Sequence, residues 1–224
     1  MISELFIKIS ILGLPIMIAI TFHEAAHGLV AYLRGDDTAY RLGRVSFNPF
    51  KHIDPLGTIV IPGILLLSQA PFLFGYAKPV PVAFERLKNP RWDTILVAAA
   101  GPLTNMVLAI ISALVLKNLS LETDPNIYLI EIMKTSLYTN VVLAAFNLLP
   151  ILPLDGGRIA VALLPRQLGQ QIAGLERWSM AILIGGLMIL PLILTGLGFH
   201  FSPISWLLEA PIKKLLKGIE FIIG

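Results

Sequence analysis

The residues best suited to chemistry are two histidines and a glutamate near the start of the chain, in His23-Glu24-Ala25-Ala26-His27. Positions four residues apart on an α-helix lie one above the other on the same face, so the two imidazoles can reach one metal ion. Glu24 would lie beside that pair, where it could take a proton from a water molecule on the metal. The pattern predicts a zinc site with an adjacent base.

The setting of this motif favours function over coincidence. Residues 20–28 are otherwise apolar, and ionisable groups in an apolar membrane helix are costly and are usually functional. From average residue usage, the pattern should arise by chance in roughly one chain of this length in a few hundred. A polar patch at the end of a membrane helix is the alternative interpretation.

A catalytic zinc ion usually has three protein ligands, and the candidate for the third is Asp155. It follows a helix that ends at prolines and precedes Gly156 and Gly157, so its carboxylate could be turned into the protein. An ordinary surface turn is the alternative. Zinc with two neutral imidazoles, one aspartate and one hydroxide carries no net charge, which suits a site within a membrane.

Asn147 and His52 are the remaining polar candidates. Asn147 lies one turn before Pro150 and could hydrogen-bond the substrate backbone or a developing oxyanion. An interhelical hydrogen bond is its alternative role. His52 could contact substrate or support a metal ligand, although a solvated histidine at the membrane boundary is the favoured interpretation.

Composition indicates the class of protein. Of the 224 residues, 56% are hydrophobic and 14% are charged, and the mean hydropathy is +0.80. These values predict an integral membrane protein, with one domain over residues 1–224. The chain has no cysteine, so histidine and carboxylate are the strong metal ligands that remain. The net charge of +3 is spread over several loops, which gives no support to nucleic-acid binding.

Membrane helices are the elements expected to position these residues. Apolar segments of about 20 residues recur along the chain, as helical spans require. We expect an all-α polytopic membrane protein with about five to six membrane segments. No removable signal peptide is expected, because the first apolar stretch leads directly into the histidine motif. The predicted helices cover residues 2–33, 92–116, 127–149, 178–199 and a last stretch from 204.

Three segments between the first and second of these helices have irregular patterns. Residues 38–56 alternate in polarity and contain turn residues, which predicts one or two short surface β-strands. Residues 57–75 are apolar but interrupted by prolines and glycines, so they could cross the membrane or form a re-entrant segment. Residues 77–82, with alternating prolines, should run extended.

Topology links the two distant parts of the predicted site. Asp155 can join the histidines only if it emerges on the side where the first helix ends, which requires residues 57–75 to be re-entrant or to cross twice. The same arrangement gathers the basic residues of 34–51, 78–91 and 158–177 on one face. Because positive charge marks the cytoplasmic side, the site is expected toward the cytoplasm of a multi-pass cell-membrane protein.

The two informative stretches together resemble the signature motifs of the site-2 protease family, which are membrane-embedded zinc metalloproteases. These stretches are His23-Glu24-Ala25-Ala26-His27 and the segment from Asn147 to Gly156. The resemblance implies that the zinc ligands are His23, His27 and Asp155. It also implies that Glu24 is the catalytic base and that Asn147 lines the substrate site.

The resemblance covers about residues 10–165, and helices over 178–222 follow that core. Residues 101–105, Gly-Pro-Leu-Thr-Asn, are similar to a third and weaker family element. The chain has no room for a PDZ or CBS domain, so a compact member is expected.

The predicted function is zinc-dependent intramembrane endopeptidase activity on or near the transmembrane segments of membrane proteins. One zinc ion per chain, the lipid bilayer and a membrane-protein substrate are the implied partners. A transporter or proton relay that uses the same ionisable residues is the alternative, although no inverted repeat supports it. A pseudoprotease is a further alternative, against which the intact Glu24 argues. Substrate identity and oligomeric state stay open.

Overall fold

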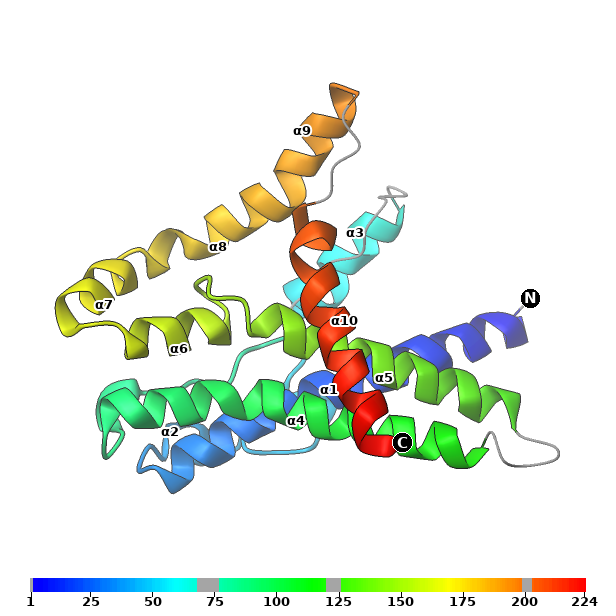
Figure 1. Ribbon diagram of the computed structural model, residues 1–224, viewed down its shortest axis with the longest axis horizontal. Coiled ribbons are helices and arrows are strands. Elements are labelled where there is room, and N and C mark those ends of the chain that lie inside the picture. The colour runs from blue at the N-terminus through cyan, green and yellow to red at the C-terminus, as the bar shows by residue number, and fades with distance from the viewer. Residues whose placement is uncertain (1, 68–76, 120–125, 199–202) are drawn as a thin grey trace.

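The computed structural model describes residues 2–67, 77–119, 126–198 and 203–224 (Figure 1). Regular structure in these residues is helical. The longer helices are α1 (Ile2–Leu33), α4 (Pro90–Leu119), α5 (Ile127–Asn147) and α10 (Pro203–Ile223). The shorter helices are α2 (Thr38–Arg41), α3 (Ile61–Leu67), α6 (Asp155–Leu163), α7 (Arg166–Ala173), α8 (Glu176–Ile184) and α9 (Leu190–Gly196). Single turns are η1 (Pro49–Lys51), η2 (Pro55–Val60), η3 (Phe84–Arg86) and η4 (Gly185–Ile189).

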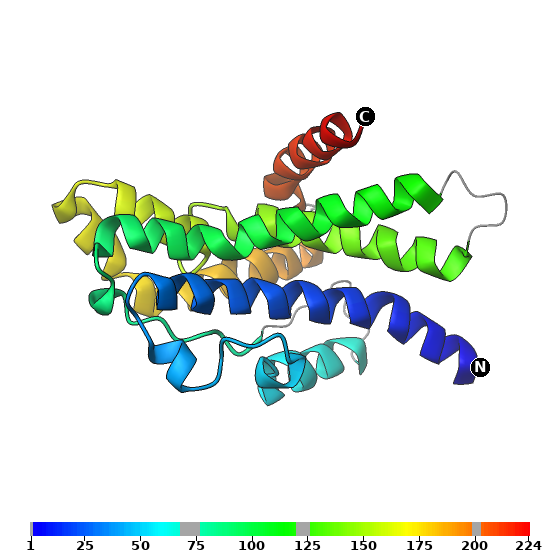
Figure 2. The same ribbon diagram turned by 90° about the horizontal axis from the view of Figure 1, so that it is seen from below.

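Helices α1, α4 and α5 form the centre of the molecule and lie side by side along its long axis (Figures 1 and 2). Each contains a stretch long and apolar enough to cross a membrane: Ser10–Leu33, Pro90–Leu119 and Ile127–Asn147. Helix α4 runs opposite to the other two. Helix α1 therefore ends where α4 begins, whereas α5 ends further along the bundle, where its last residue, Asn147, lines the same cavity as His23, His27 and Asp155 (Figure 1).

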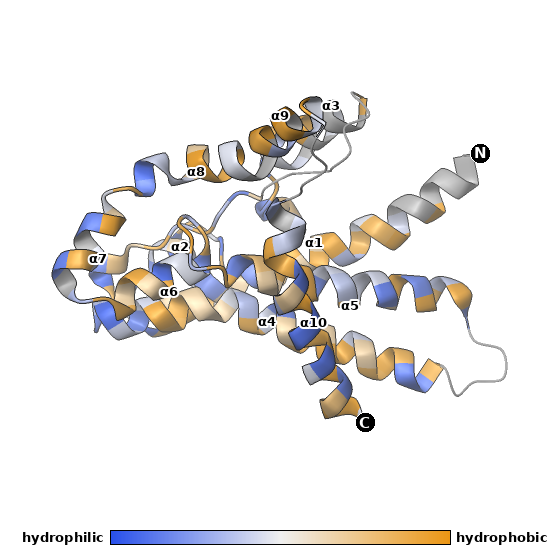
Figure 3. Ribbon diagram, turned by 45° about the horizontal axis from the view of Figure 1, so that its top comes forward, coloured by the Kyte–Doolittle hydropathy of each residue, from blue (hydrophilic) through white to orange (hydrophobic). Residues whose placement is uncertain are grey.

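Helix α4 has two faces of different chemistry. Leu103, Val107 and Ile111, four residues apart, are 62%, 56% and 50% exposed and form an apolar stripe directed outward. The buried face is built from small or polar residues, among them Ala98, Gly101, Asn105, Ala109 and Ser112. Small side chains let membrane helices approach closely, and an exposed apolar stripe suits contact with lipid. Figure 3 shows the hydrophobic colour continuing along α4 and α1.

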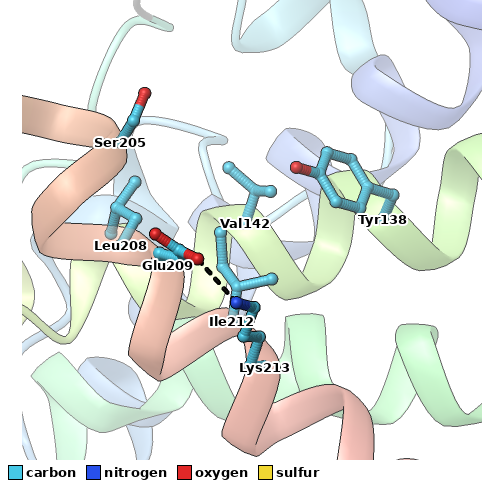
Figure 4. Close-up of a pocket in the computed structure, with 7 residues that line it drawn as sticks. All are labelled: Tyr138, Val142, Ser205, Leu208, Glu209, Ile212 and Lys213. Atoms are coloured by element: carbon cyan, nitrogen blue, oxygen red, sulfur yellow. Dashed lines mark hydrogen bonds and ion pairs between the residues drawn. The ribbon is translucent and has the colours of Figure 1, made fainter. Parts of the chain in front are cut away.

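The chain after α5 forms α6–α10, which lie outside this centre and do not enclose it (Figures 1 and 2). Helices α8, η4 and α9 follow one another as a long helical run, and α10 crosses α5 (Figure 1). Between α5 and α10 lies a cavity of about 470 Å³. Figure 4 shows Tyr138 and Val142 of α5 facing Leu208 and Ile212 of α10, with an ion pair between Glu209 and Lys213.

The predicted surface strands are wrong for the described residues, which contain helical turns there instead. Asn48 and Asp54 each precede a proline, and their side chains accept hydrogen bonds from the amides of the helical turns that follow, η1 and η2. A capping Asn or Asp followed by proline is a helix-start signal. Asn, Asp and Pro are also common in the turns between strands, which is why the sequence predicted strands here.

The number of membrane segments and the re-entrant segment stay predictions. Within 57–75, the described part is η2 and α3, and residues 68–76 lie outside the described residues. The predicted helix at 178–199 corresponds to α8, η4 and α9, which end at Gly196. None of these, nor α10, is among the three helices identified above as long and apolar enough to span. Residues 77–83 have no regular secondary structure, consistent with the predicted extended run.

Candidate metal centre

Three side chains from α1 and α6 converge at the end of the bundle. The Nε2 atoms of His23 and His27 lie 3.0 Å apart. Asp155 Oδ2 lies 3.3 Å from the first and 3.4 Å from the second. All three side chains are nearly buried. The structure thus brings together the three residues that the sequence proposed as ligands.

The spacing of these three atoms fits a tetrahedral zinc ion. Ligand atoms at about 2.0–2.1 Å from zinc stand roughly 3.3 Å apart at tetrahedral angles. The observed separations of 3.0, 3.3 and 3.4 Å surround that value. Asp155 Oδ2 is fully buried and has no hydrogen-bond partner among the described residues. A cation bound at this point would pair with that oxygen and offset the cost of burying it.

Both imidazoles are oriented by α4 through their other nitrogen atom. His27 Nδ1 lies 2.7 Å from the Val97 carbonyl oxygen, and His23 Nδ1 lies 2.6 Å from Asn105 Oδ1. An Nδ1–H that donates to an oxygen leaves a lone pair on Nε2, which is the form that binds a metal. Three Lewis-basic atoms therefore point at one another, and a metal ion bound between them would pair with all three.

The close approach of α4 to α1 depends on Gly101. A Cβ atom on this residue would lie 2.6 Å from His23 Nε2, well inside van der Waals contact. Helix α4 can therefore pass directly over the imidazoles only because a glycine is present. This explains one residue of the Gly-Pro-Leu-Thr-Asn stretch, to which the sequence argument gave no role.

Asp155 is held in place by tight backbone packing at the start of α6. The α5 helix ends at Asn147, and Asp155 is the first residue of α6. A Cβ atom on Gly156 would overlap the Leu148 carbonyl, and one on Gly157 would lie 2.5 Å from the carbonyl carbon of Ile151. The two glycines let α6 begin directly against the preceding turn. A carboxylate in the first turn of a helix is also favoured by the helix dipole.

The charge of Asp155 suits a cation ligand. Burial acts to raise the pKa of this carboxyl group, but protons carried by the His23 and His27 imidazoles, in the place a metal ion would take, outweigh burial and lower the pKa to about 2. The group is therefore ionised at neutral pH, and two imidazoles with one carboxylate form a ligand set typical of zinc.

Glu24 lies next to this centre and is held by a neighbouring segment. Its Oε2 accepts a hydrogen bond of 2.7 Å from the Val80 amide. Val80 belongs to the extended segment 77–83, which the Lys78 amide also fixes by donating to the His52 carbonyl. Glu24, the three converging side chains and residues 79–82 all line one cavity of about 370 Å³. The base candidate thus faces the same space as the ligand candidates.

Comparison with known sequences fits this geometry. The sequence model of Peptidase family M50 matches residues 11–125 and 122–192. The chain belongs to this family. M50 peptidases include the site-2 proteases, so the resemblance seen in the motifs is confirmed.

The relatives of this M50 member carry metalloprotease names. The chain is 36% identical to "Putative zinc metalloprotease YwhC" of Bacillus subtilis over 212 residues, which covers 92% of this chain and 89% of the relative. It is 32% identical to "Putative zinc metalloprotease sll0528" of Synechocystis over 65% of this chain and 38% of that protein. It is 33% identical to "Zinc metalloprotease MJ0392" of Methanocaldococcus jannaschii, over 49% of this chain and 30% of that protein.

No solved structure gave a significant match. The chain spans well under half the length of the Synechocystis and Methanocaldococcus proteins. Family membership, the relatives' names and the apolar helices together support a membrane-associated metalloprotease.

Asn147 lines the cavity of this M50 member together with Glu24 and the three candidate ligands, and its predicted contact with substrate stays a prediction. Its amide nitrogen donates to the Leu143 carbonyl one turn earlier in α5. Among the described residues, the interhelical hydrogen bond considered from the sequence is not seen.

His52 differs from the favoured interpretation, because it is buried and not solvated. It is 2% exposed, and its Nε2 lies 2.8 Å from the Ser46 carbonyl oxygen. It does not line the cavity with Glu24. Packing of residues 46–52 against the segment at Lys78 removes it from water.

The groups that orient the site residues were not predicted from the sequence. The Val97 carbonyl and Asn105 orient the two histidines, and the Val80 amide holds Glu24. Backbone groups leave no signal in a sequence. Asn105 was part of a recognised stretch, and a buried amide within an apolar helix was the available signal.

Proposed function

We propose that this M50 member is a zinc-dependent endopeptidase that hydrolyses peptide bonds in or near transmembrane segments of membrane proteins. The observation that carries the proposal is the convergence of His23 Nε2, His27 Nε2 and Asp155 Oδ2, three Lewis-basic atoms 3.0–3.4 Å apart beside Glu24. These three side chains would hold one zinc ion per chain.

The chain's own residues would carry the proton transfers. Zinc bound there would supply a Lewis acid that brings the pKa of water toward neutrality and polarises a substrate carbonyl. Glu24 faces the same cavity and would accept the proton released by water, then donate it to the leaving amine. The Val80 amide holds the Glu24 carboxylate and limits its rotamers, so the base is positioned before substrate arrives.

The substrate would be a locally unwound stretch of chain. Peptide bonds within a helix are protected by their own hydrogen bonds, so an extended conformation is needed beside the zinc site. The segment 77–82 offers backbone carbonyl groups for such a strand, but Pro79 and Pro81 have no amide to donate. Asn147, which lines the same cavity, would supply an amide to the substrate backbone or the developing oxyanion.

The proposed location is the cell membrane, with the site toward the cytoplasm. The end of α1 lies beside the start of α4, where the Lys88 amide donates to the Arg34 carbonyl and further basic residues such as Arg91 follow. An excess of positive charge marks the cytoplasmic side of membrane proteins. A multi-pass arrangement of α1, α4 and α5 would place the cavity at that boundary.

The test combines metal content with cleavage by detergent-purified protein. The parent should hold about one zinc ion per chain, and the His23→Ala and Asp155→Ala variants should lose it. Glu24→Gln should keep zinc and the Val80 hydrogen bond but lose cleavage of a transmembrane substrate by at least about 100-fold. Zinc retained in both ligand variants would refute the proposed centre. Zinc bound without any cleavage by the parent would instead favour the pseudoprotease alternative.

A further inference from the structure

A chain of buried amides leads from His23 away from the cavity. Asn105 of α4 places its Oδ1 2.6 Å from His23 Nδ1, and its Nδ2 lies 2.8 Å from Asn140 Oδ1 on α5. Asn105 is 0% exposed and Asn140 is 1% exposed. Burying two amides between apolar helices is costly unless they are fully paired. Asn140 touches none of the three candidate ligands, and it does not line the cavity with Glu24.

Backbone carbonyls fix the direction of this hydrogen-bond chain. The Ser136 carbonyl can only accept, so the Asn140 atom 2.9 Å from it is the amide nitrogen. Asn140 therefore turns its Oδ1 toward Asn105, and the Asn105 amide nitrogen must donate the hydrogen bond to it. The Ala19 carbonyl, 3.2 Å from the same nitrogen, requires the same orientation.

The consequence reaches the metal centre. Since Asn105 presents only its oxygen to His23, the proton of a neutral His23 imidazole must lie on Nδ1 and the lone pair on Nε2. His27 is held in the same tautomer by the Val97 carbonyl oxygen, which can only accept a hydrogen bond. No other group is needed to fix the orientation of that oxygen. His23 depends on an amide, and an amide can rotate to present its nitrogen instead.

We propose that Asn140 is a positioning residue for the metal centre. Acting through Asn105, it fixes His23 in the tautomer whose Nε2 binds a cation. The inference rests on the proposed metal-dependent function and extends it to a residue on α5, outside the site. Without Asn140, the orientation of Asn105 would depend on the longer hydrogen bond to Ala19 alone.

Variants at Asn140 separate this role from simple packing. Asn140→Ala removes the acceptor for Asn105, and loss of such a supporting residue typically weakens metal binding about 10–100-fold. Asn140→Asp in its neutral form keeps both an acceptor and a donor, so it should bind metal nearly as the parent does. Val141→Ala is the matched control for packing, because Val141 follows Asn140 in α5, is 0% exposed and packs against Ala109 and Ala113 of α4.

The measurement is titration of the detergent-purified full chain with Co²⁺, followed by its visible absorption, with melting temperature recorded without metal. We expect weaker binding and an altered spectrum for Asn140→Ala, with parent-like results for Asn140→Asp and Val141→Ala. Parent affinity and spectrum in Asn140→Ala would overturn the inference while leaving the proposed function intact. Equal losses in Val141→Ala would also overturn it, since packing would then be the cause.

Two further outcomes have distinct meanings. If Asn140→Ala does not fold, Asn140→Leu fills the space without an acceptor and decides the question by the same titration. If the parent binds neither Co²⁺ nor Zn²⁺, the proposed function itself is wrong, and the inference falls with it.

Discussion

Gly101 of α4 lies directly against the imidazole of His27, so that a Cβ atom on this glycine would be 2.5 Å from Nε2. Gly101→Ala should therefore push the two imidazoles apart or lift α4 away from α1. We expect zinc content to fall to near zero, with a destabilisation of about 1–3 kcal/mol from overpacking. Metal analysis and thermal melting of the purified variant would measure both.

Gly218→Ala is the control for that substitution. Gly218 lies within α10, and a Cβ atom there would meet nothing within 4 Å. Alanine in an open helical position is neutral or stabilises by up to about 1 kcal/mol. Full zinc content in Gly101→Ala would show that the histidines are not held as described.

Gly156→Ala should displace Asp155 without changing any candidate ligand. The new Cβ atom would overlap the Leu148 carbonyl, which belongs to the backbone and cannot rotate away. The start of α6 must shift, and zinc affinity should fall at least about 10-fold. Competition with a chelator would measure the affinity, with Gly186→Ala as the control because that position is open. An unchanged affinity would mean that α6 does not set the position of the carboxylate.

Asp36 should make the fold sensitive to acid. It follows α1, is fully buried, and accepts hydrogen bonds from the Thr38 hydroxyl and amide and from the Ala83 amide. Burial acts to raise its pKa, but these hydrogen bonds outweigh burial and hold the pKa below its ordinary value. The folded state is thus stabilised above the unfolded pKa of about 3.9, and this contribution is lost as pH falls through the lower folded pKa.

Asp36→Asn should accordingly lower the free energy of unfolding at neutral pH by about 1–3 kcal/mol and flatten its dependence below about pH 4. Asp37→Asn is the neighbouring control. Asp37 forms exposed ion pairs with Arg41 and Arg86, which are worth no more than about 1 kcal/mol. Denaturant titration across pH would compare the two, and equal effects would contradict the account of Asp36.

The proposed topology can be tested with single cysteines, since the chain has none of its own. Arg41 lies beyond the end of α1, and Tyr128 lies in the first turn of α5, at the opposite end of the bundle (Figure 1). With an impermeant thiol reagent, Arg41→Cys should react in inverted vesicles and Tyr128→Cys in right-side-out vesicles. Labelling of both from one side would rule out the proposed arrangement.

The length of the apolar segments and the residues that end them were enough to predict the long helices. The predicted 2–33 matches α1, and the predictions for α4 and α5 differ from the structure by at most three residues at each end. The misassigned segment was 38–56, where capping by Asn48 and Asp54 starts helical turns. Local capping chemistry and local turn chemistry use the same residues, so polarity alone could not separate a capped helix from a strand.

Two of the three candidate ligands were predictable from residue spacing within one helix. His23 and His27 share a helix face by spacing alone, whereas Asp155 needed the topology argument and the family resemblance. The partners of Asn105 depend on how α4 is rotated against α1 and α5. No pattern within one helix specifies that rotation, which is why Asn140 passed unnoticed among the apolar residues of α5.

Helix α4 provides none of the three candidate ligands, yet through Val97, Gly101 and Asn105 it contacts both imidazoles. Separating α1 from α4 would therefore disrupt the metal centre. We expect these two helices to keep their relative position throughout the reaction. We expect residues 77–83, on the other side of the cavity, to move aside as a substrate chain enters and then to return beside it, because Val80 must again hold Glu24 for the reaction. A disulfide joining α1 to α4 far from the cavity should leave cleavage intact, whereas one that ties 77–83 to α1 should stop it. A substrate chain would then enter the cavity only from the side formed by residues 77–83.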